Sequence, residues 1–366
     1  MYGFENIYVE EGAREFPLTE RILNRLGSEA VVVSDFRDIP VAEEGKKSLV
    51  LAVHRGRVVK NCPGTAGHVC CGYHVINQVL GCDVDCTYCI LNCYINAPGV
   101  VVNVNLGDTF VELNGVLDGK RKYIYRVGTG ELTDSFYLDR LTGLAAGFVR
   151  YFADKKNVLF ELKTKKTDID GVLDLDHRGK TIISWSLNAD PVAGSEEANA
   201  ATIRERLEAA GRAQKQGYYI GFHFDPMVHH KGWEAGYDKT ARAIFDFVDP
   251  KRILWISLGT FRSPPRLFEI IRRRHPKSRI VTGESFPGDD GKLRYIKPLR
   301  VEMYRSLLNS LKKYGGDDLF VYLCMERKDV WEKVYGNASE TPRNSGDLDR
   351  MFHENLKRKW SVDGES

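Results

Sequence analysis

The cysteines are the residues whose type and spacing most clearly predict chemistry. Seven of the eight lie between Cys62 and Cys93, and Cys82, Cys86 and Cys89 follow a C-x₃-C-x₂-C spacing. Thiolates are the favoured ligands of iron–sulfur clusters. Three thiolates on one short loop can hold three irons of a [4Fe–4S] cubane and leave the fourth iron open, as a catalytic metal centre requires. The spacing therefore predicts a catalytic iron–sulfur site.

A zinc site is the alternative use of the same cysteines. A dense group of thiols in a reducing compartment indicates metal binding or redox chemistry before structural disulfides. Zinc sites usually take their ligands as C-x₂₋₄-C pairs. Cys70 and Cys71 are adjacent, which is poor geometry for two ligands of one ion. The sequence therefore favours the iron–sulfur interpretation over zinc.

Short apolar runs alternate with amphipathic stretches beyond the cysteines. The runs predict strands at Lys122–Val127, Asn157–Lys163, Thr181–Leu187, Tyr218–Phe224 and Ile253–Leu258. The stretches between and after them predict helices at Leu138–Phe152, Glu197–Gln216, Gly232–Phe247 and Pro264–Arg274. This alternation indicates βα units and a parallel sheet. One further strand directly before Cys82 gives about six units, fewer than a closed eight-fold barrel needs, so we expect an α/β fold with a partial (β/α)₆ barrel.

Smaller segments flank the predicted barrel. A helical pattern at Thr19–Leu26 and apolar runs at Ala30–Val33 and Ser48–Val53 predict a small N-terminal α/β extension. Near the other end, a Gly-Asp-Asp-Gly turn predicts a hairpin or long loop, Arg300–Tyr314 predicts a helix, and the polar stretch from Asn337 is expected to be partly disordered. We expect three regions: residues 1–70 as the extension, 71–282 as the barrel, and 283–366 as hairpin, helix and tail.

Polar residues follow several of the predicted strands. They are Gly128-Thr-Gly-Glu131, Thr164-Lys165, Ser186 with Asn188, and His223 with Asp225. In parallel α/β folds the chemistry sits at the carboxyl ends of the strands. We therefore expect one cavity to collect these residues and the cysteine loop, with His223 and Asp225 as polar contacts in its wall.

Composition sets limits on the partners of the chain. Lys and Arg number 53 against 50 Asp and Glu, a balance that neither demands nor excludes nucleic acid. No run approaches the roughly 18 apolar residues of a membrane span, and the first residues lack the basic start and apolar stretch of a secretory signal. We expect a cytoplasmic monomer without a membrane partner.

The cysteine loop, with an aromatic residue directly before its last cysteine, resembles the signature of the radical S-adenosylmethionine superfamily. The resemblance implies that the methionine group chelates the open iron and that an electron from the cluster cleaves the sulfonium to a 5′-deoxyadenosyl radical. Gly128, Gly130 and Glu131 resemble the superfamily's Gly-Gly-Glu motif, in which glycines admit the ligand and the carboxylate pairs with its amino group. Lys165 and Ser186 could bind the cofactor carboxylate, or form a solvated lysine run and an ordinary strand end.

A more specific resemblance covers roughly residues 50–300. Motifs occur in the order found in the spore photoproduct lyase family, among them Cys62-Pro-Gly-Thr65, His68-Val-Cys-Cys-Gly-Tyr73, Ser186-Leu-Asn188 and Gly232-Trp-Glu-Ala-Gly-Tyr237. That family uses the adenosyl radical to reverse a UV-induced thymine lesion in DNA. The resemblance implies that Cys82, Cys86 and Cys89 bind the cluster and that Thr133, Lys165 and Ser186 contact the cofactor.

The same resemblance implies a DNA-binding region formed by Arg262 and the hairpin-like segment Lys292–Lys297. In that segment Lys292, Arg294 and Lys297 flank Tyr295. Basic side chains could meet phosphates, and the aromatic ring could wedge or stack. The alternative interpretation is a solvated surface hairpin.

Two positions depart from the family pattern. Glu131 stands where the family commonly has a hydrogen-donating cysteine, and Ile90 stands where it has a tyrosine after the last cluster cysteine. Tyr88 is present, and Cys93 or Cys71 could supply the missing thiol, although a small buried cysteine has the same sequence pattern.

The departures leave two readings open. The chain is either a DNA repair lyase with an altered hydrogen donor or a paralogue that applies the same cofactor chemistry to another substrate. A non-enzymatic iron–sulfur module that binds DNA is disfavoured, because an open iron and polar strand ends would serve no purpose there. The expected partners are DNA and an electron donor such as flavodoxin or ferredoxin.

Overall fold

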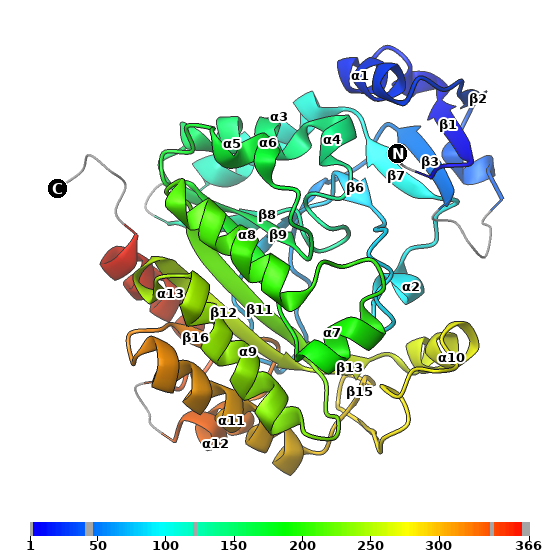
Figure 1. Cartoon of the computed structure of the whole chain (residues 1–366). Coiled ribbons are helices and arrows are strands. Elements are labelled where there is room, and N and C mark those ends of the chain that lie inside the picture. The colour runs from blue at the N-terminus through cyan, green and yellow to red at the C-terminus, as the bar shows by residue number, and fades with distance from the viewer. Residues whose placement is uncertain (1–2, 41–46, 120–122, 337–339, 361–366) are drawn as a thin grey trace.

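The predicted strands assemble into one eight-stranded sheet in the computed structural model, which describes residues 3–40, 47–119, 123–336 and 340–360 (Figure 1). Its order is β16-β12-β11-β10-β9-β8-β5-β4, parallel except for the antiparallel β4–β5 pair. The strands are β4 (Val59–Asn61), β5 (His74–Ile76), β8 (Tyr125–Gly128), β9 (Val158–Thr164), β10 (Thr181–Ser186), β11 (Tyr219–Met227), β12 (Ile253–Thr260) and β16 (Val321–Leu323). Lys122, the predicted start of β8, lies outside the described residues. The curled sheet confirms the partial barrel.

Helices between these strands cover the outside of the sheet (Figure 1). They include α3 (Leu106–Asp118), α5 (Leu144–Ala153), α6 (Asp170–Leu173), α7 (Asp190–Glu196), α8 (Ile203–Lys215) and α9 (Trp233–Phe247). Helix α10 (Pro265–Arg274) lies apart from the sheet and contacts α2 (Leu91–Tyr94). The predicted helix at Leu138–Phe152 is divided, because Gly143 adopts a φ of +64° and ends α4 (Asp139–Thr142) before α5 begins. The predicted helix at Glu197–Gln216 begins later, because Thr202 caps α8 in a capping box with Glu205.

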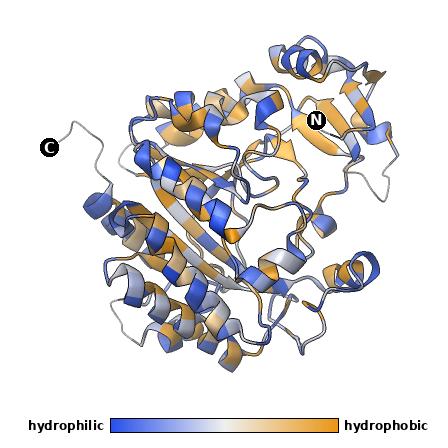
Figure 2. Cartoon of the chain, viewed as in Figure 1, coloured by the Kyte–Doolittle hydropathy of each residue, from blue (hydrophilic) through white to orange (hydrophobic). Residues whose placement is uncertain are grey.

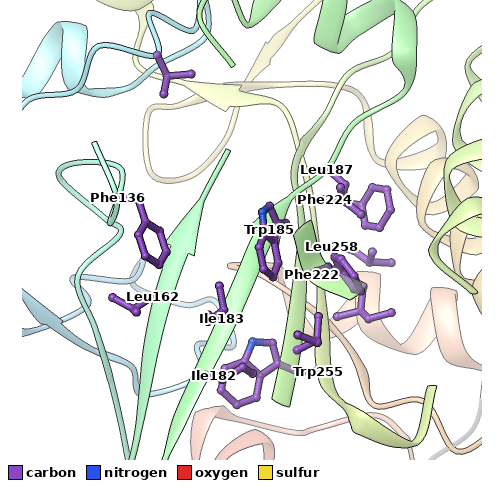
Figure 3. Packing of buried hydrophobic residues seen from close by; sticks show 14 of the residues in the cluster. Phe136, Leu162, Ile182, Ile183, Trp185, Leu187, Phe222, Phe224, Trp255 and Leu258 are labelled. Atoms are coloured by element: carbon purple, nitrogen blue, oxygen red, sulfur yellow. The ribbon is translucent and has the colours of Figure 1, made fainter. Parts of the chain in front are cut away.

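Apolar side chains along β9, β10, β11 and β12 form the main core. Leu162, Ile183, Phe222 and Leu258 are fully buried, and Figure 3 shows them on neighbouring strands beside Trp185. Strands buried on both faces are expected to be continuously apolar. Polar residues within these buried strands are therefore exceptions, and each needs a functional role or a hydrogen-bond or ion-pair partner.

A smaller sheet forms the N-terminal extension. Its order is β2-β1-β3-β7-β6, with β1 (Asn6–Glu10), β2 (Val31–Val33), β3 (Ser48–Ala52), β6 (Val79–Leu80) and β7 (Val100–Asn103), and α1 (Pro17–Leu26) lies beside it. Figure 2 shows strands of this sheet in the hydrophobic colour. The strand directly before Cys82 is β6, which pairs with β7 rather than joining the barrel. The expected barrel strand is instead β5, and the division of the chain at residues 70 and 282 stays a prediction.

The switch between the two sheets has a local cause. The Gln78 side chain lies between β5 and β6, where its amide donates to the Asn103 carbonyl and its oxygen accepts from Thr109 Oγ1 at 2.7 Å. These buried bonds fix the chain as it leaves β5 and joins β7. A sequence pattern of period two does not report such a change of sheet.

The described part of the C-terminal region contains a hairpin and three helices. The predicted turn joins β14 (Phe286–Pro287) to β15 (Leu293–Arg294), which also pairs with β13 (Arg262–Ser263). The helices are α11 (Lys297–Gly315), α12 (Lys328–Tyr335) and α13 (Ser345–Lys359). Disorder is wrong for the part of the tail that forms α13, because Leu348, Phe352 and Leu356 are buried on one face of it; residues 337–339 and 361–366 lie outside the described residues. No described helix is long and apolar enough to cross a membrane.

Candidate active site

The loop from Cys82 to Cys89 is sharply bent and carries three thiols within eight residues. Asp85 adopts a φ of +52° in the middle of the loop, and Cys89 N donates to the Cys86 carbonyl at 3.0 Å. Burial raises the pKa of the Cys82 thiol, and Asp134 and Cys89 raise it further. Burial also raises the pKa of Cys86 to about 12, and Cys89 contributes to this shift. The loop therefore holds three thiols in a largely desolvated place, with Cys89 near enough to affect both Cys82 and Cys86.

These thiols fit an iron–sulfur cluster better than a single ion. Across the described ranges, no three His, Cys, Asp or Glu side chains converge closely enough to bind one metal ion. Each iron of a cubane takes its own thiolate, so the ligands of a cluster spread around it rather than meeting at a point. Val84 N donates to Cys82 Sγ at 3.4 Å, a contact of the kind that tunes cluster potentials. Cys82, Cys86 and Cys89 are the residues that would hold the cluster.

A buried network of hydrogen bonds and one ion pair packs against the loop. Thr87 N donates to the Glu196 carbonyl at 2.8 Å, and the backbones of Cys86 and Glu197 form an isolated antiparallel β-bridge. The Tyr88 hydroxyl donates to the Glu197 carboxylate, which also pairs with Arg206. Tyr88 is only 8% exposed, and burial followed by Glu197 raises its pKa. The geometry gives Tyr88 a clear supporting contact, and its predicted catalytic role stays a prediction.

Lys165 lies beside the loop, where its charge acts on Glu197 and lowers the pKa of that carboxyl. Its ammonium is 5.8 Å from the centre of the Tyr88 ring and makes no ion pair with a described residue. It is close enough to oppose the upward shift of the Cys86 pKa. Its backbone N donates to Asp134 Oδ2 at 2.7 Å. A half-buried ammonium next to the cluster loop, without a close ion pair to a described residue, is suited to a carboxylate ligand.

The segment after β8 is fastened to the other side of the loop. Thr133 Oγ1 donates to the carbonyl of Gly81, directly before Cys82, at 2.7 Å. Asp134 accepts from Thr164 Oγ1 at 2.8 Å, which ties this segment to the end of β9. Ser186 lies at the end of β10, is 8% exposed, and its carbonyl accepts from Arg206 Nη1 at 2.8 Å. The predicted cofactor residues thus come from three neighbouring strand ends, as parallel folds require.

Gly128 and Gly130 have a packing role that the sequence did not reveal. A Cβ on Gly128 would collide with the Tyr73 hydroxyl, and one on Gly130 would lie 2.5 Å from Lys163 Cβ. The glycines therefore allow β8 to pass close to its neighbours. The Glu131 carboxylate pairs with Lys163, so the expected partner for an incoming amino group already has a cation.

Further charged pairs lie on the same side of the sheet. Glu161 of β9 accepts from His223 Nε2 at 2.7 Å and from Ser184. Burial raises the pKa of Glu161, but His223 and the other donors outweigh it and lower the pKa to about 2. Asp225 pairs with Arg262 at 3.2 Å. The sequence missed Glu161, Lys163 and Ser184, because they lie inside strands rather than at strand ends.

The residues predicted to bind DNA differ strongly in exposure. Arg294 and Tyr295 are each 6% exposed. Arg294 pairs with Asp290 at 2.5 Å, and the Tyr295 hydroxyl accepts from His229 N at 3.1 Å. A Tyr295 ring that wedges between bases and an Arg294 guanidinium that binds a phosphate would both need to be accessible. In the structure both side chains are instead buried and packed against the hairpin.

The other predicted DNA contacts are more accessible or differently placed. Lys292 is half-buried, and its ammonium lies 3.4 Å from Thr65 Oγ1. Lys297 is exposed and pairs with Asp329, but it begins α11 rather than belonging to the hairpin. Arg262 is half-buried beside Asp225.

Cys93 lies on α2 (Leu91–Tyr94), one turn after Cys89. It is half-buried; burial raises its pKa, and Arg266 on α10 opposes that shift. This places Cys93 between the cluster loop and α10.

Comparisons with known proteins agree with this architecture. The sequence profile of the family described as spore photoproduct lyase matches residues 2–287. A spore photoproduct lyase of Clostridium acetobutylicum is 23% identical over 350 residues, covering 87% of this chain and 98% of the relative. One of a Geobacillus species is 26% identical over 297 residues, covering 76% and 84%.

A solved structure of a doubly substituted spore photoproduct lyase with bound AdoMet and dinucleoside spore photoproduct has the same fold. Its TM-score is 0.76 at 22% identity, covering 88% of this chain and 98% of that one. The profile match extends over most of the barrel and the N-terminal sheet. The chain therefore belongs to the spore photoproduct lyase family.

Proposed function

We propose that this protein binds a [4Fe–4S] cluster and S-adenosylmethionine and repairs the spore photoproduct, a UV thymine lesion, in DNA. The observation that carries the proposal is the bent loop of three thiols with the half-buried Lys165 ammonium beside it. When bound and reduced, the cluster supplies the electron that cleaves S-adenosylmethionine to methionine and a 5′-deoxyadenosyl radical. Relatives of the family named spore photoproduct lyase, and a solved one holding AdoMet and the dinucleoside lesion, support it.

In this proposal the chain's own residues hold and orient the cofactor. Lys165 pairs with the carboxylate of the cofactor, because it makes no close ion pair with a described residue and its charge also reaches Glu197 only at longer range. Thr133 and Ser186 offer hydrogen bonds from neighbouring strand ends. Gly128 and Gly130 let the backbone at the end of β8 pass close to its neighbours. Glu131 can bind the amino group of the cofactor only if its carboxylate contacts that group and Lys163 at the same time.

The proposed DNA face runs along the hairpin and α10. Lys292, Lys297 and Arg262 are the proposed contacts, and Arg294 and Tyr295 support them from within the hairpin. Arg272 and Arg273 at the end of α10 are exposed. The next residue, Arg274, donates to Asn92 at 3.2 Å, directly beyond the cluster loop. Cations on both sides of the loop would contact phosphates and position a lesion over it.

The source of the hydrogen atom that returns to the repaired product is where the proposal departs from the family pattern. Cys93 is the proposed source, and Tyr88 is the second proposed catalytic residue, since Glu131 carries no hydrogen atom that is easily abstracted. Cys93→Ala should then leave cleavage of S-adenosylmethionine intact while thymidine release falls at least tenfold. Equal loss of both reactions would argue against this role.

A second candidate is a paralogous enzyme that acts on another substrate with the same cofactor. The charged pairs Glu131–Lys163, Glu161–His223 and Asp225–Arg262 favour it, because they make the sheet face strongly polar. A thymine dinucleoside offers carbonyl and amide groups rather than charges to such a surface.

Turnover of the lesion distinguishes the two candidates. Reconstituted and reduced protein is incubated with dinucleoside spore photoproduct and with DNA that contains it, and thymidine recovery is measured. We expect recovery with both substrates and weaker DNA binding as salt rises. Cleavage of S-adenosylmethionine without thymidine recovery would contradict repair and favour the paralogue. A flavodoxin- or ferredoxin-type electron donor, a monomeric state and a cytoplasmic location belong to the same proposal.

A further inference from the structure

One carboxylate lies at the centre of the concave face of the barrel sheet. Glu161 of β9 accepts at Oε1 from the Ser184 hydroxyl of β10. The same oxygen accepts from His223 Nε2 of β11 at 2.7 Å and from Trp255 Nε1 of β12 at 3.2 Å. Neighbouring strands lie about 4.8 Å apart, so side chains from β9 and β12 can meet at one atom only inside a curled sheet. Glu161 and its three donors therefore face the interior of the barrel.

The side chains of this inner face become more exposed towards the carboxyl ends of the strands. The Glu161 side chain is 2% exposed and that of His223 is 11% exposed. Lys163 and Asp225, each two residues further along the same strands, are 19% and 26% exposed. Alternate residues of a strand point to the same side of a sheet, so all four belong to one inner wall. This wall opens at the end of the sheet where the proposed cofactor residues lie.

His223 is the deepest accessible side chain of the four. Its register neighbour on β10 is Ser186, one of the proposed cofactor contacts. The Nε2 atom of His223 is occupied by Glu161, whereas the other ring nitrogen, Nδ1, makes no hydrogen bond with a described residue and remains accessible. The described chain thus leaves one polar atom of this ring for a ligand.

The contact with Glu161 also decides what Nδ1 can do. A carboxylate that receives three donors is ionised, and an ionised carboxylate only accepts. Nε2 must therefore carry the proton of the neutral His223 ring, and Nδ1 keeps its lone pair. In serine proteases an aspartate orients the catalytic histidine in the same way, and the far nitrogen acts as the acceptor. His223 consequently offers an oriented acceptor beside the proposed cofactor site.

An acceptor of this kind selects a ligand with an N–H group. Each thymine ring of the proposed lesion has one ring N–H, the imide between its two carbonyl groups. Enzymes that act on single bases read this edge of the base with hydrogen bonds. A carbonyl group cannot donate to Nδ1, and a ligand without the N–H would leave a largely buried acceptor unpaired, which costs affinity.

We propose that His223 Nδ1 accepts the imide N–H of one thymine ring of the lesion and so helps to determine specificity. Glu161 is the positioning residue, because it orients the ring without touching the substrate. Since the thymine lesion is taken as the substrate, this role of His223 rests on the proposed function. The contact would hold the base next to Ser186 and the cofactor.

Binding of a methylated lesion tests the contact. Wild type and His223→Phe are reconstituted, saturated with S-adenosylmethionine without a reductant, and titrated at pH 8, which favours the neutral imidazole. The ligands are dinucleoside spore photoproduct and its analogue methylated at both imide nitrogens. Calorimetry should show that the wild type binds the methylated analogue at least tenfold more weakly. His223→Phe should bind both ligands alike, because the coupling between ring and N–H is gone.

Variants of Glu161 test its positioning role. Glu161→Leu removes the acceptor for Nε2, so the ring can turn, and we expect the preference for the unmethylated lesion to be lost. Glu161→Gln keeps an oxygen acceptor and should restore the preference. Ser257→Ala is the matched control, since Ser257 is the register neighbour of His223 on β12. It has no described hydrogen bond with the ring and should show the wild-type preference.

Each result is informative about one of the two proposals. Equal affinity of the wild type for both ligands, in protein that repairs the unmethylated one, would overturn the role of His223 and leave the repair function intact. This comparison needs no variant, and circular dichroism checks the fold of the variants. A preference that survives in His223→Phe would also overturn the role. Wild-type protein that neither binds nor repairs the lesion would refute the proposed function, and the contact with it.

Discussion

Arg206 offers a sharp test of how the cluster loop is held in place. Its side chain is fully buried, pairs with Glu197, and donates to the carbonyls of Ser186 and Ala201 at 2.8 Å each. Arg206→Met would leave the Glu197 carboxylate with the Tyr88 hydroxyl and the more distant Lys165 charge, and would remove one donor from each of two carbonyls. Breaking a buried ion pair by removing one partner costs roughly 3–5 kcal/mol, a large share of the 5–15 kcal/mol typical of a folded protein.

Urea unfolding of the cluster-free protein measures this cost, and Arg204→Met on the same helix is the matched control. Arg204 is exposed and pairs with Glu208 at 2.8 Å, an interaction worth about 0.5 kcal/mol or less. The midpoint should fall strongly for Arg206→Met and hardly move for Arg204→Met, with similar slopes. Iron uptake should also fall for Arg206→Met, because the backbone of Glu197 pairs with that of the ligand residue Cys86 in a β-bridge. Equal midpoints for the two variants would refute the idea that this ion pair supports the loop.

Three further predictions concern the barrel face. The folded-state pKa of Glu161 is lowered to about 2, so its stabilising effect is present above its unfolded pKa and is lost as pH falls towards 2. Glu161→Gln should flatten the fall in unfolding free energy between about pH 5 and 2; an unchanged slope would contradict the pairing with His223. Lys165→Met should weaken S-adenosylmethionine binding about tenfold in calorimetry of the reconstituted protein, because a charge-assisted contact is lost; unchanged affinity would exclude that contact. Gly130→Ala should destabilise the fold by about 1–3 kcal/mol in urea, since its Cβ would crowd Lys163; wild-type stability would show that the strands can move apart.

The sequence was most informative about elements with strong periodicity. Strands β9 to β12 lie within two to three residues of their predicted bounds, because long apolar runs between amphipathic helices have few alternative structures. Helix α13 was missed although Leu348, Phe352 and Leu356 recur every four residues, since charged residues dominate its composition. Strand β6 was assigned to the wrong sheet, because its partner β7 is set by tertiary contacts of Gln78.

The candidate site was predictable where chemistry follows local spacing. The C-x₃-C-x₂-C loop needs no knowledge of the fold, whereas the Glu131–Lys163 and Glu161–His223 pairs depend on which strands are neighbours. The sequence also did not predict which of the proposed DNA-binding side chains are buried. The alternation of Arg294 and Tyr295 with basic residues suggested a surface hairpin, and only packing against His229 and Asp290 shows these side chains to be inside.

The most direct test of the central claim is formation of 5′-deoxyadenosine. Protein reconstituted anaerobically with iron and sulfide is mixed with S-adenosylmethionine and dithionite, and the product is measured by chromatography. The wild type should form 5′-deoxyadenosine and methionine in equal amounts, and Cys82→Ala, Cys86→Ala and Cys89→Ala should each form none above background. Cys324→Ala is the control outside the loop and should retain cleavage. Cleavage that survives loss of Cys86, or a wild type that binds a cluster and never cleaves the cofactor, would contradict the account.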